Sequence, residues 1–508
     1  MENITPSAAP PTPGQRAGAW SACALKALCV LGIAGLAGCA AELPFLPVAV
    51  AIPTQWQAPL PHKGKLTELS QWWQQQNDPL LVELIMAAEV VNPTIASARS
   101  NIEQARAARV ASGAAMLPTL DASAGFSRSR SAPVNRTEPP PVNAAQIGLQ
   151  TAWEIDLFGG YAASRDADQQ RLDGSQAQWH AARVSVAAEV ATLYYHLRGC
   201  DKLQAVARAD AASRVETARL AELSAGAGFQ APATAALARA SAAEGRANAI
   251  QQGALCDLDI KALVALTALG EADLRQKLAQ NPDAGPAETL APVISVPAEV
   301  LNQRPDVFNA LREVDAAHLE VGSARAERYP RLNLSGNITT SKTVTRGVSQ
   351  RFDTWSVGPL QLTIPLFDGG ASDANVEAAK ARYENAVVQY RDSVRQAVRE
   401  VEEALVNLQS TAERDQEAAT AAEGYRASFT GTEARYQSGL ASLVELEDAR
   451  RTLLAAQSAV VTLQRDRRSA WVALYRALGG GWTPASPAPP AMQGELSSSA
   501  AAPAAAPY

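Results

Sequence analysis

The chain has 508 residues, a net charge of −6 and a pI near 5.5, and aromatic residues make up only 5% of it. The acidic balance excludes a protein built to bind nucleic acid, because phosphate binding requires a basic face. An alanine-rich chain with few aromatics favours long helices packed through small residues. The sequence has no run of 18 or more uncharged apolar residues, so we expect any membrane-spanning segment to be a β-strand.

The N-terminus carries the pattern of a lipoprotein signal. Arg16 and Lys26 precede a short apolar run that ends in Leu36-Ala37-Gly38-Cys39. Positive charge, an apolar segment and then small residues form a secretory signal, and cysteine after Leu-Ala-Gly resembles the bacterial lipobox. The resemblance implies cleavage after residue 38 and a covalent lipid on Cys39, and Ala40 favours the outer membrane as destination. A plain signal with a chance cysteine is the alternative.

Two further cysteines predict a disulfide. Once the signal is removed and Cys39 is lipidated, Cys200 and Cys256 remain as a pair in an oxidising compartment. Gly228 lies midway between them, inside the turn-like run Ser224–Gly228. If two helices fold back at that run, the cysteines lie level on neighbouring helices, and a bond between them is geometrically possible.

The chain also contains an internal duplication. Each half carries the same landmarks in the same order, at offsets of 212 (330 − 118), 210 (370 − 160) and 211 (439 − 228): Leu117-Pro118-Thr119-Leu120 and Tyr329-Pro330-Arg331-Leu332, Asp156–Gly160 and Leu366–Gly370, Gly228 and Gly439, and Ala238-Arg239 and Ala449-Arg450. Each half is therefore predicted to form a helix, two strands, a long helix, a turn and a returning helix. The expected segments are the signal 1–38, the lipidated N-terminal segment 39–91, the first repeat 92–290, the second repeat 291–482 and a disordered Pro/Ala-rich tail 483–508.

Four segments alternate apolar and polar residues with the period of a β-strand. They cover residues 120–127, 146–157, 331–338 and 355–366. In the fourth segment the alternation changes phase at Gly358-Pro359, where we expect a bulge or bend. About ten residues of such alternation are typical of transmembrane strands. A soluble sandwich with one solvent-exposed face is the alternative.

A heptad-like apolar stripe predicts a very long helix in the second half. No Gly or Pro occurs from Ala371 to Glu423, and continuation to about Arg435 gives some 60 residues, or roughly 90–100 Å. A helix of this length suits a strut across a compartment better than a globular core. The stripe consists of Val376, Tyr383, Val387, Tyr390, Val394, Val398, Val401, Leu405 and Leu408.

Four strands cannot close a membrane barrel, because the smallest known barrels need about eight. Cyclic assembly of identical chains solves this problem, and three copies supply twelve strands. We therefore favour a trimer, although composition alone also allows a dimer.

Several ordered segments resemble the TolC family of outer-membrane efflux channels, in particular its OprM/NodT-type lipoprotein branch. The resemblance covers more than 400 positions and rests on Trp72-Trp73, Asp78-Pro79, Arg304-Pro305-Asp306, Val357-Gly358-Pro359, Pro365–Gly370, Arg435–Gly439 and Leu446–Arg450. It implies an α+β membrane protein, a homotrimer whose 12-stranded β-barrel lies in outer-membrane lipid and continues into a long α-helical periplasmic barrel. It also implies docking through a periplasmic adaptor (membrane fusion protein) to an inner-membrane pump of the RND type, and export of drugs or small toxic compounds. Protein secretion through the same duct is the alternative.

The resemblance further implies a gate at the periplasmic mouth, where family members are closed at rest by polar contacts near the second turn. The matching positions are Arg435, Tyr436 and Asp448. Three Asp448 carboxylates near one axis would form a ring, with Arg435 and Tyr436 as hydrogen-bond donors from across the hairpin. An ordinary surface ion pair is the alternative.

The two turns themselves are the predicted adaptor contacts, namely Gly228 and Phe229 in the first and Gly439 and Leu440 in the second. The segment 230–233 departs from the family pattern, which leaves the identity of the adaptor open.

We expect no enzyme, no metal site and no cofactor beyond the lipid on Cys39. His62, His180, His196 and His318 are widely separated, and neither a phosphate-binding loop nor a nucleophile-elbow motif occurs. A non-conducting coiled-coil lipoprotein remains as an alternative. It accounts for the lipobox and the heptads but not for the strands and the duplication.

Overall fold

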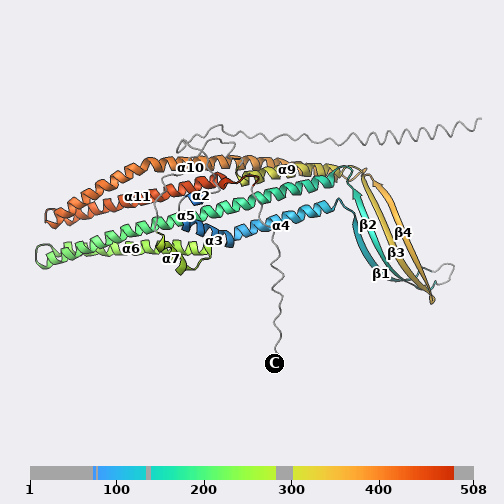
Figure 1. Ribbon diagram of the computed structural model, residues 1–508, viewed down its shortest axis with the longest axis horizontal. Coiled ribbons are helices and arrows are strands. Elements are labelled where there is room, and N and C mark those ends of the chain that lie inside the picture. The colour runs from blue at the N-terminus through green and yellow to red at the C-terminus, as the bar shows by residue number, and fades with distance from the viewer. Residues whose placement is uncertain (1–71, 76–77, 133–138, 282–300, 302, 486–508) are drawn as a thin grey trace, which may run out of the picture. The chain divides into compact units, whose positions relative to one another are not determined.

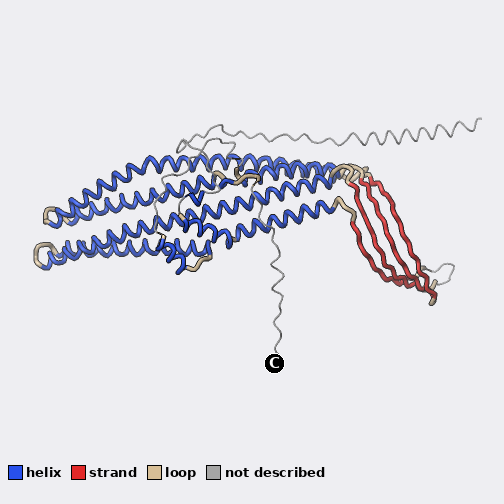
Figure 2. Tube along the Cα trace, viewed as in Figure 1, coloured by secondary structure: helices blue, strands red, loops and turns tan. Residues whose placement is uncertain are grey.

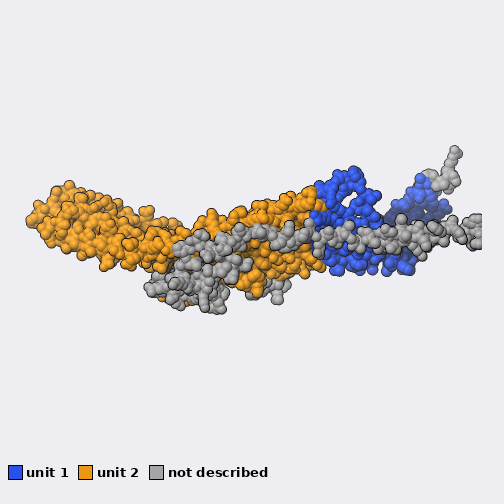
Figure 3. Space-filling view, turned by 90° about the horizontal axis from the view of Figure 1, so that it is seen from above, with its two compact units in different colours: residues 1–48, 116–163, 322–375 blue, residues 49–115, 164–321, 376–508 orange. Residues whose placement is uncertain are grey.

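The structure is a computed structural model that describes residues 72–75, 78–132, 139–281, 301 and 303–485. Cys39, the signal segment, the repeat boundary at 290/291 and most of the predicted tail lie outside these residues, so those predictions stay predictions. The described residues form two compact units, coloured separately in Figure 3: those within 116–163 and 322–375, and those within 72–115, 164–321 and 376–485. Each unit contains residues from both halves of the duplication. The units therefore differ in secondary structure, sheet in one and helices in the other, and do not correspond to the two repeats.

The first unit is built around one antiparallel sheet of four strands in the order β1-β2-β3-β4. Figure 2 shows these strands in red, and each half of the chain contributes one hairpin of two strands. The four predicted strands are confirmed, with bounds β1 (Thr119–Ser129), β2 (Val142–Ile155), β3 (Arg331–Thr345) and β4 (Val348–Thr363).

The predicted change of phase in the fourth strand is confirmed as well. The pairing of β3 with β4 shifts register between Leu334 and Gly336, opposite the segment that contains Gly358 and Pro359. The Gly358–Pro359 peptide bond is cis, and Gly358 has a φ of 104°. Proline has no amide hydrogen to donate to a neighbouring strand, and glycine tolerates this φ, so the two residues fit the place where the ladder is interrupted.

The second unit is a bundle of helices dominated by two long hairpins (Figure 1). In each hairpin a helix of 67 residues, about 100 Å at 1.5 Å per residue, returns through a helix about half as long. The helices are α2 (Trp72–Gln75), α3 (Pro79–Val91), α4 (Pro93–Ala114), α5 (Gly160–Gly226), α6 (Pro232–Thr267), α7 (Glu271–Gln280), α9 (Pro305–Ala326), α10 (Ala371–Gln437) and α11 (Leu443–Ala477), and a 3₁₀ turn η2 (Gly479–Gly481) follows. The predicted order of elements in each half is thus confirmed.

Small residues explain how such long helices pack closely. Val394, Val401 and Leu405 of the predicted stripe on α10 are buried, but buried alanines alternate with them, such as Ala397 and Ala404. Alanine carries the highest helix propensity and allows close approach of neighbouring helices. Within the described residues, no single helix passes the length and hydropathy test for a membrane span, and α3 and α4 pass it only together, across a bend of 49°.

Aromatic contacts and a capping carboxylate attach the short helices α2 and α3 to the long helices. Trp72 packs 5.9 Å from Trp471 and 5.8 Å from Tyr475, measured between ring centroids. Asp78 caps α3 by accepting from the Leu81 amide at 3.1 Å. Its second carboxylate oxygen accepts from the Tyr194 hydroxyl at 2.7 Å, which ties α3 to α5.

Candidate functional site: an apolar sheet face and two hairpin turns

One face of the sheet presents apolar side chains to the outside. The register aligns Ala122, Leu149, Ile338 and Trp355 in one row across all four strands. The three large side chains of this row are exposed in the single chain. Exposed apolar surface of this extent indicates contact with lipid or a partner.

The opposite face of the same strands is polar. Asp121, Ser123 and Gln150 belong to this face, and the Gln150 side chain donates to the Ser123 hydroxyl at 3.1 Å. A sheet with one apolar and one polar face, in strands of 11 to 16 residues, has the pattern of a membrane strand whose polar side lines an aqueous lumen.

The two hairpin turns have the same backbone structure. In the first, Gly228 has a φ of 82° and the Phe229 amide donates to the Ser224 carbonyl at 2.9 Å. In the second, Gly439 has a φ of 74° and the Leu440 amide donates to the Arg435 carbonyl at 2.8 Å. In both turns a glycine with left-handed backbone angles ends the helix, and no other residue tolerates these angles as well as glycine.

These turns expose large apolar side chains. Phe229 is 85% exposed and Leu440 is 71% exposed. Their positions at the ends of the hairpins agree with a role in contacting a partner, and the adaptor contact itself stays a prediction.

The three predicted gate residues lie at the second turn but do not bind one another within the described chain. Arg435 donates to the Leu440 carbonyl at 3.1 Å and lies 3.7 Å from the Glu445 carboxylate. Asp448 forms an exposed ion pair with Arg451. The predicted bonds from Arg435 and Tyr436 to Asp448 are therefore not intrachain contacts, and a ring of three Asp448 side chains would require other copies.

Tyr436 differs from its neighbours because its ring packs into a small core. That core joins both hairpins near the turns through Ala218, Ala221, Ala238, Ala242, Leu443 and Leu446. The Tyr436 hydroxyl is buried and has no hydrogen-bond partner among the described residues. A buried hydroxyl without a partner costs roughly 1–3 kcal/mol, so this packing is less stable than it could be.

Next to Asp448, a buried network of charges joins the second hairpin to the first. Arg450 of α11 is 2% exposed and donates to the Thr217 hydroxyl of α5 at 2.8 Å. It also pairs with Glu447, and its Nε lies 4.0 Å from Asp210. Arg214 completes the network through Asp210 at 2.8 Å and Glu447 at 3.4 Å.

Burial shifts two of these groups. Burial raises the pKa of the Asp210 carboxyl above its ordinary value, and this effect outweighs the opposing effect of Arg214. Burial also lowers the pKa of Arg450, against the opposing effects of Glu447 and Asp210. The contact between the hairpins therefore depends on charges whose desolvation is only partly offset.

The first hairpin is cross-linked. Cys200 of α5 and Cys256 of α6 form a disulfide, with their Cα atoms 5.5 Å apart. This is the pair that the sequence predicts. The two cysteines lie opposite each other on neighbouring helices, as expected from their equal distance from Gly228 along the chain.

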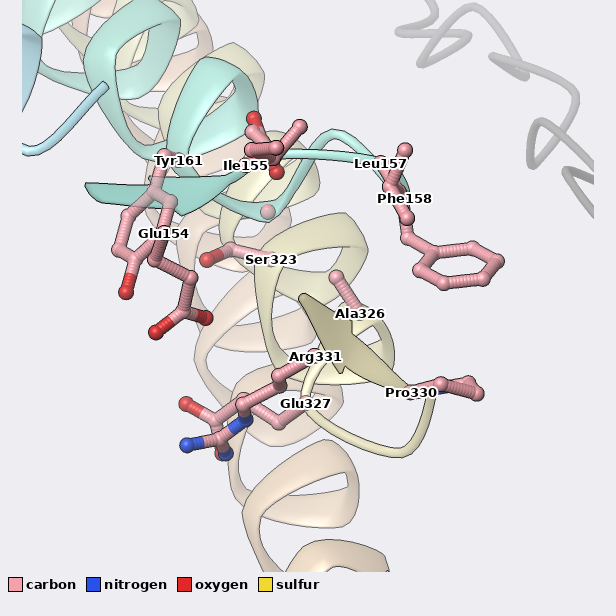
Figure 4. Close-up of a pocket in the computed structure, with 12 residues that line it drawn as sticks. Glu154, Ile155, Leu157, Phe158, Tyr161, Ser323, Ala326, Glu327, Pro330 and Arg331 are labelled. Carbon is pink, nitrogen blue, oxygen red and sulfur yellow. The ribbon is translucent and has the colours of Figure 1, made fainter. Parts of the chain in front are cut away.

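A small pocket lies where the two halves meet at the end of the sheet. It has a volume of about 150 Å³, and its polar lining includes Glu154, Tyr161 and Arg331. Figure 4 shows Glu154 and Tyr161 on one side of the pocket and Phe158 and Pro330 on the other. The Phe158 ring stacks on Tyr329, with ring centroids 4.7 Å apart and planes 16° apart.

The histidines of the described residues lie in separate surroundings. His180 and His318 pack against aromatic rings, and His196 contacts Asp259 at 2.8 Å. Within these residues, no group of three or more His, Cys, Asp or Glu side chains could hold a metal ion.

Comparison with known proteins settles the family. The sequence profile described as "Outer membrane efflux protein" matches residues 84–269 and 296–480, one segment in each half. The chain belongs to this family. The predicted resemblance to outer-membrane efflux channels is confirmed.

Individual relatives and a solved structure agree with this assignment. The outer membrane protein OprJ of Pseudomonas aeruginosa is 31% identical over 454 residues, which cover 87% of this chain and 92% of OprJ. The toluene efflux pump outer membrane protein TtgI of Pseudomonas putida is 29% identical over 90% of this chain and 98% of its own. The structure of the outer-membrane channel OprN superposes with a TM-score of 0.74 at 28% identity and covers 86% of this chain and 99% of OprN. The predicted fold class of an outer-membrane channel subunit is confirmed.

Sequence reasoning missed the side chains that hold this outer membrane efflux protein together. Arg450 and Arg304 served only as landmarks, yet both are buried, and Arg304 pairs with Asp306 at 2.7 Å and Glu400 at 2.8 Å. The sequence held no signal for the burial of Arg450, because its equivalent Arg239 also lies four residues after a buried residue, Ala235, and is exposed.

Proposed function

We propose that three copies of this chain form the outer-membrane duct of an efflux system. The apolar sheet face of each copy contacts lipid, so that twelve strands close a barrel in the outer membrane. The long hairpins extend from it as a tunnel through the periplasm. The duct passes drugs or small toxic organic compounds and performs no catalysis.

The observation that carries this proposal is the pairing of two features in one duplicated chain. The sheet exposes an apolar face that a soluble monomer would bury, with Leu149, Ile338 and Trp355 all open to the outside. The hairpins are about 100 Å long, far more than a globular core requires. A passive stalk would explain the hairpins but not the two-faced sheet.

The hairpin turns are the part of the duct that would dock on its periplasmic partner. Six hairpin turns from three copies would surround the periplasmic mouth, where the exposed Phe229 and Leu440 dock on a periplasmic adaptor. The adaptor connects the duct to an inner-membrane pump of the RND type. The lipid on Cys39 anchors each copy in the outer membrane.

The mouth is closed at rest by the segment that contains Arg435, Tyr436 and Asp448. In a trimer, the exposed Asp448 side chains would face one axis and repel one another unless cations or donors bind them. Contacts from Arg435 of neighbouring copies would hold the ring closed. Tyr436, whose ring packs against the small core near the turns, would keep the turn in place for these contacts. Adaptor binding at the turns would open it.

The class of cargo is inferred from relatives. Among them are a solvent efflux pump outer membrane protein and a toluene efflux pump outer membrane protein, both from Pseudomonas putida, each 29% identical to this chain. These names favour small organic molecules over secreted proteins.

Single-channel conductance in planar bilayers tests the proposal. We expect the purified, lipid-modified protein to show small or rare openings, because the mouth is closed without an adaptor. Asp448→Ala is expected to enlarge or prolong the openings. Glu222→Ala, which removes an exposed carboxylate of the first hairpin that pairs with Arg239, is the matched control. Absence of conductance from every variant, despite correct insertion, would support the non-conducting lipoprotein instead.

A further inference from the structure

A cavity of about 940 Å³ lies between the two hairpins and is lined by residues of α5, α6, α10 and α11. Val190 and Tyr194 of α5 pack into the core that contains the short helices α3 and α7. Glu189, Thr192 and His196 lie on the opposite face of α5, are exposed and line the cavity. Among the described residues, the cavity is therefore on the uncovered side of this helix.

Both halves of the duplication turn the same face toward this cavity. The offset of 211 residues that relates the two turns (439 − 228) also relates residues of the cavity wall. The equivalent pairs are Glu189 and Glu400, Thr192 and Glu403, His196 and Asn407, Ala262 and Ala473, and Ala265 and Arg476. In the proposed trimer six repeats would present this face around one axis, so the cavities would open into the lumen of the duct.

Small side chains explain why the hairpins leave this space between them. Six residues of the cavity wall are alanine, and all four helices contribute to them. Leu193 of α5 and Leu266 of α6 add apolar surface and are only half-buried. A largely apolar wall with a few polar groups, around a volume of roughly 300–1,000 Å³, is typical of sites for small molecules.

The charged residues of the wall favour a cation as the ligand. They are Glu189, Glu400, Glu403 and Arg476. Glu400 is engaged elsewhere, because Arg304 donates to it at 2.8 Å. Glu189 forms no ion pair with any described residue, and Glu403 has only an exposed contact of 3.7 Å with Arg399. Two carboxylates are thus available to a bound cation, against one guanidinium.

The histidine of the wall does not change this balance. The Nδ1 atom of His196 lies 2.8 Å from the Asp259 carboxylate, so a charge on the ring is offset by that neighbour. The equivalent residue of the second repeat, Asn407, is uncharged. These two side chains can add hydrogen bonds to a ligand, but the sign of the charge in the cavity is set by the carboxylates.

We infer that this cavity binds amphiphilic organic cations as they pass through the duct. The inference rests on the proposed function and names one class of its cargo. The alanines and the two leucines would contact the apolar body of the ligand, and Glu189 and Glu403 would attract its positive charge. An anion of the same size would meet two carboxylates without a strong partner and would bind more weakly.

Fluorescence anisotropy with ethidium, a planar aromatic cation, tests the inference. The purified, lipid-modified full chain is titrated in detergent at low salt, and detergent alone gives the background. We expect saturable binding of ethidium that weakens at high salt. Fluorescein, an anion of similar size, should bind more weakly by about fivefold or more, since one exposed charge pair is worth up to about a factor of five. Equal binding of the two dyes would overturn the inference.

Glu189→Gln and Glu403→Gln remove the two available charges and preserve the size of the side chains. We expect each to weaken ethidium binding by about two- to fivefold. Glu384→Gln is the matched control, because Glu384 is an exposed carboxylate of α10 outside the cavity. An equal effect of Glu384→Gln would mean that ethidium responds only to the overall charge, and would overturn the site.

Ala262→Phe fills the cavity and leaves every charge in place. It is expected to abolish saturable ethidium binding, whereas Ala236→Phe, at an exposed position of α6 outside the cavity, should preserve it. Unchanged binding to Ala262→Phe would overturn the cavity as the site. If the wild type binds no ethidium and Ala262→Phe disrupts the trimer, a neighbouring copy or another part of the chain fills the cavity, which also overturns the inference.

Conductance in planar bilayers separates this inference from the proposed function. Ethidium should reduce the current through Asp448→Ala, and addition of Glu189→Gln should raise the blocking concentration by about two- to fivefold. Normal conductance without ethidium binding or block would overturn the inference and leave the duct standing. Absence of conductance from every variant would overturn the proposed function and, with it, the assignment of the bound cation as cargo.

Discussion

The first hairpin, α5 with α6, and the second hairpin, α10 with α11, arise from one duplicated unit but are stabilised in different ways. The first carries the disulfide between Cys200 and Cys256. At the equivalent positions the second has Thr411 and Arg467, and Arg467 lies 3.7 Å from Asp415. The first hairpin is thus fixed covalently, while the second depends on noncovalent contacts with the first.

The equivalent arginines show the same contrast. Arg239 of the first hairpin is exposed and lies 3.5 Å from Glu222, whereas Arg450 is buried among Thr217, Glu447 and Asp210. The first hairpin is fixed covalently and the second is held by buried charges. This arrangement suits a channel in which only the second hairpin moves. The second hairpin also carries Asp448, the residue that we place in the gate.

The largest expected effect comes from Arg450→Ala. Removing Arg450 leaves Arg214 as the one cation that pairs with both Asp210 and Glu447. Breaking a buried charge pair destabilises a protein by about 3–5 kcal/mol. We expect the amides at the start of α11, residues 443–450, to exchange hydrogen much faster, as measured by mass spectrometry.

The matched control is Arg239→Ala at the equivalent exposed position. An exposed ion pair contributes about 0–1 kcal/mol, so exchange in α6 should change little. Similar effects of the two variants would contradict the contrast between the hairpins.

A somewhat smaller effect is expected when the disulfide is removed by Cys200→Ser with Cys256→Ser. Closing a loop of 56 residues restricts the unfolded chain, and disulfides of this kind contribute about 2–4 kcal/mol. Denaturant unfolding monitored by circular dichroism measures the loss.

The converse variant transfers the cross-link to the second hairpin through Thr411→Cys with Arg467→Cys. If the second hairpin must move, this bond should reduce channel opening, and reduction with dithiothreitol should restore it. Unchanged conductance with the bond formed would argue that the second hairpin is not the moving part.

The carboxyls of Asp210 and Asp306 should affect the pH dependence of stability with opposite signs. Because burial raises the folded pKa of Asp210, its contribution to stability is fully present below the unfolded pKa, about 3.9, and is lost as the pH rises through the folded pKa. Asp306 behaves oppositely: burial opposes its ionisation, but the hydrogen bond and the charge of Arg304, together with backbone hydrogen bonds, outweigh burial and lower its pKa. Its contribution is present above the unfolded pKa and is lost as the pH falls through the folded pKa.

Thermal unfolding of the wild type, Asp210→Asn and Asp306→Asn at several pH values tests this difference. As the pH rises from the acid range, the wild type should lose stability relative to Asp210→Asn and gain stability relative to Asp306→Asn. Parallel curves for all three proteins would mean that neither carboxyl changes its proton affinity on folding.

Periodicity in the sequence was sufficient for the strands, the long helices and their order, because backbone elements depend on local patterns. The interruption at Gly358-Pro359 and the turns at Gly228 and Gly439 were predictable for the same reason, since each rests on a specific backbone conformation. The buried charges were not predictable, because Arg239 and Arg450 follow alanine in the same way, and only packing between helices distinguishes them. The gate stays a proposal, because the resemblance points to Arg435, Tyr436 and Asp448 but their contacts depend on other copies of the chain, which one sequence does not place.

The smallest expected effect is a gain in stability, and it compares two junctions of the sheet: β2 with β3 inside the chain, and β4 with β1 of the next copy in the proposed trimer. Phe158 stacks on Tyr329 beside the internal junction, and the repeat equivalents of these residues are Phe367 and Leu117. We therefore expect Phe367 to meet the smaller Leu117 of the next copy. Leu117→Tyr would copy the internal pair, and an aromatic pair contributes about 0.5–1.5 kcal/mol beyond the area it buries. The trimer should therefore dissociate at a higher temperature, while Leu117→Ala should lower that temperature. The combination of Leu117→Tyr with Phe367→Ala is decisive, because the gain should vanish when the partner ring is absent. A gain that persists without Phe367 would mean that the new tyrosine packs elsewhere, and the two junctions would then not be equivalent.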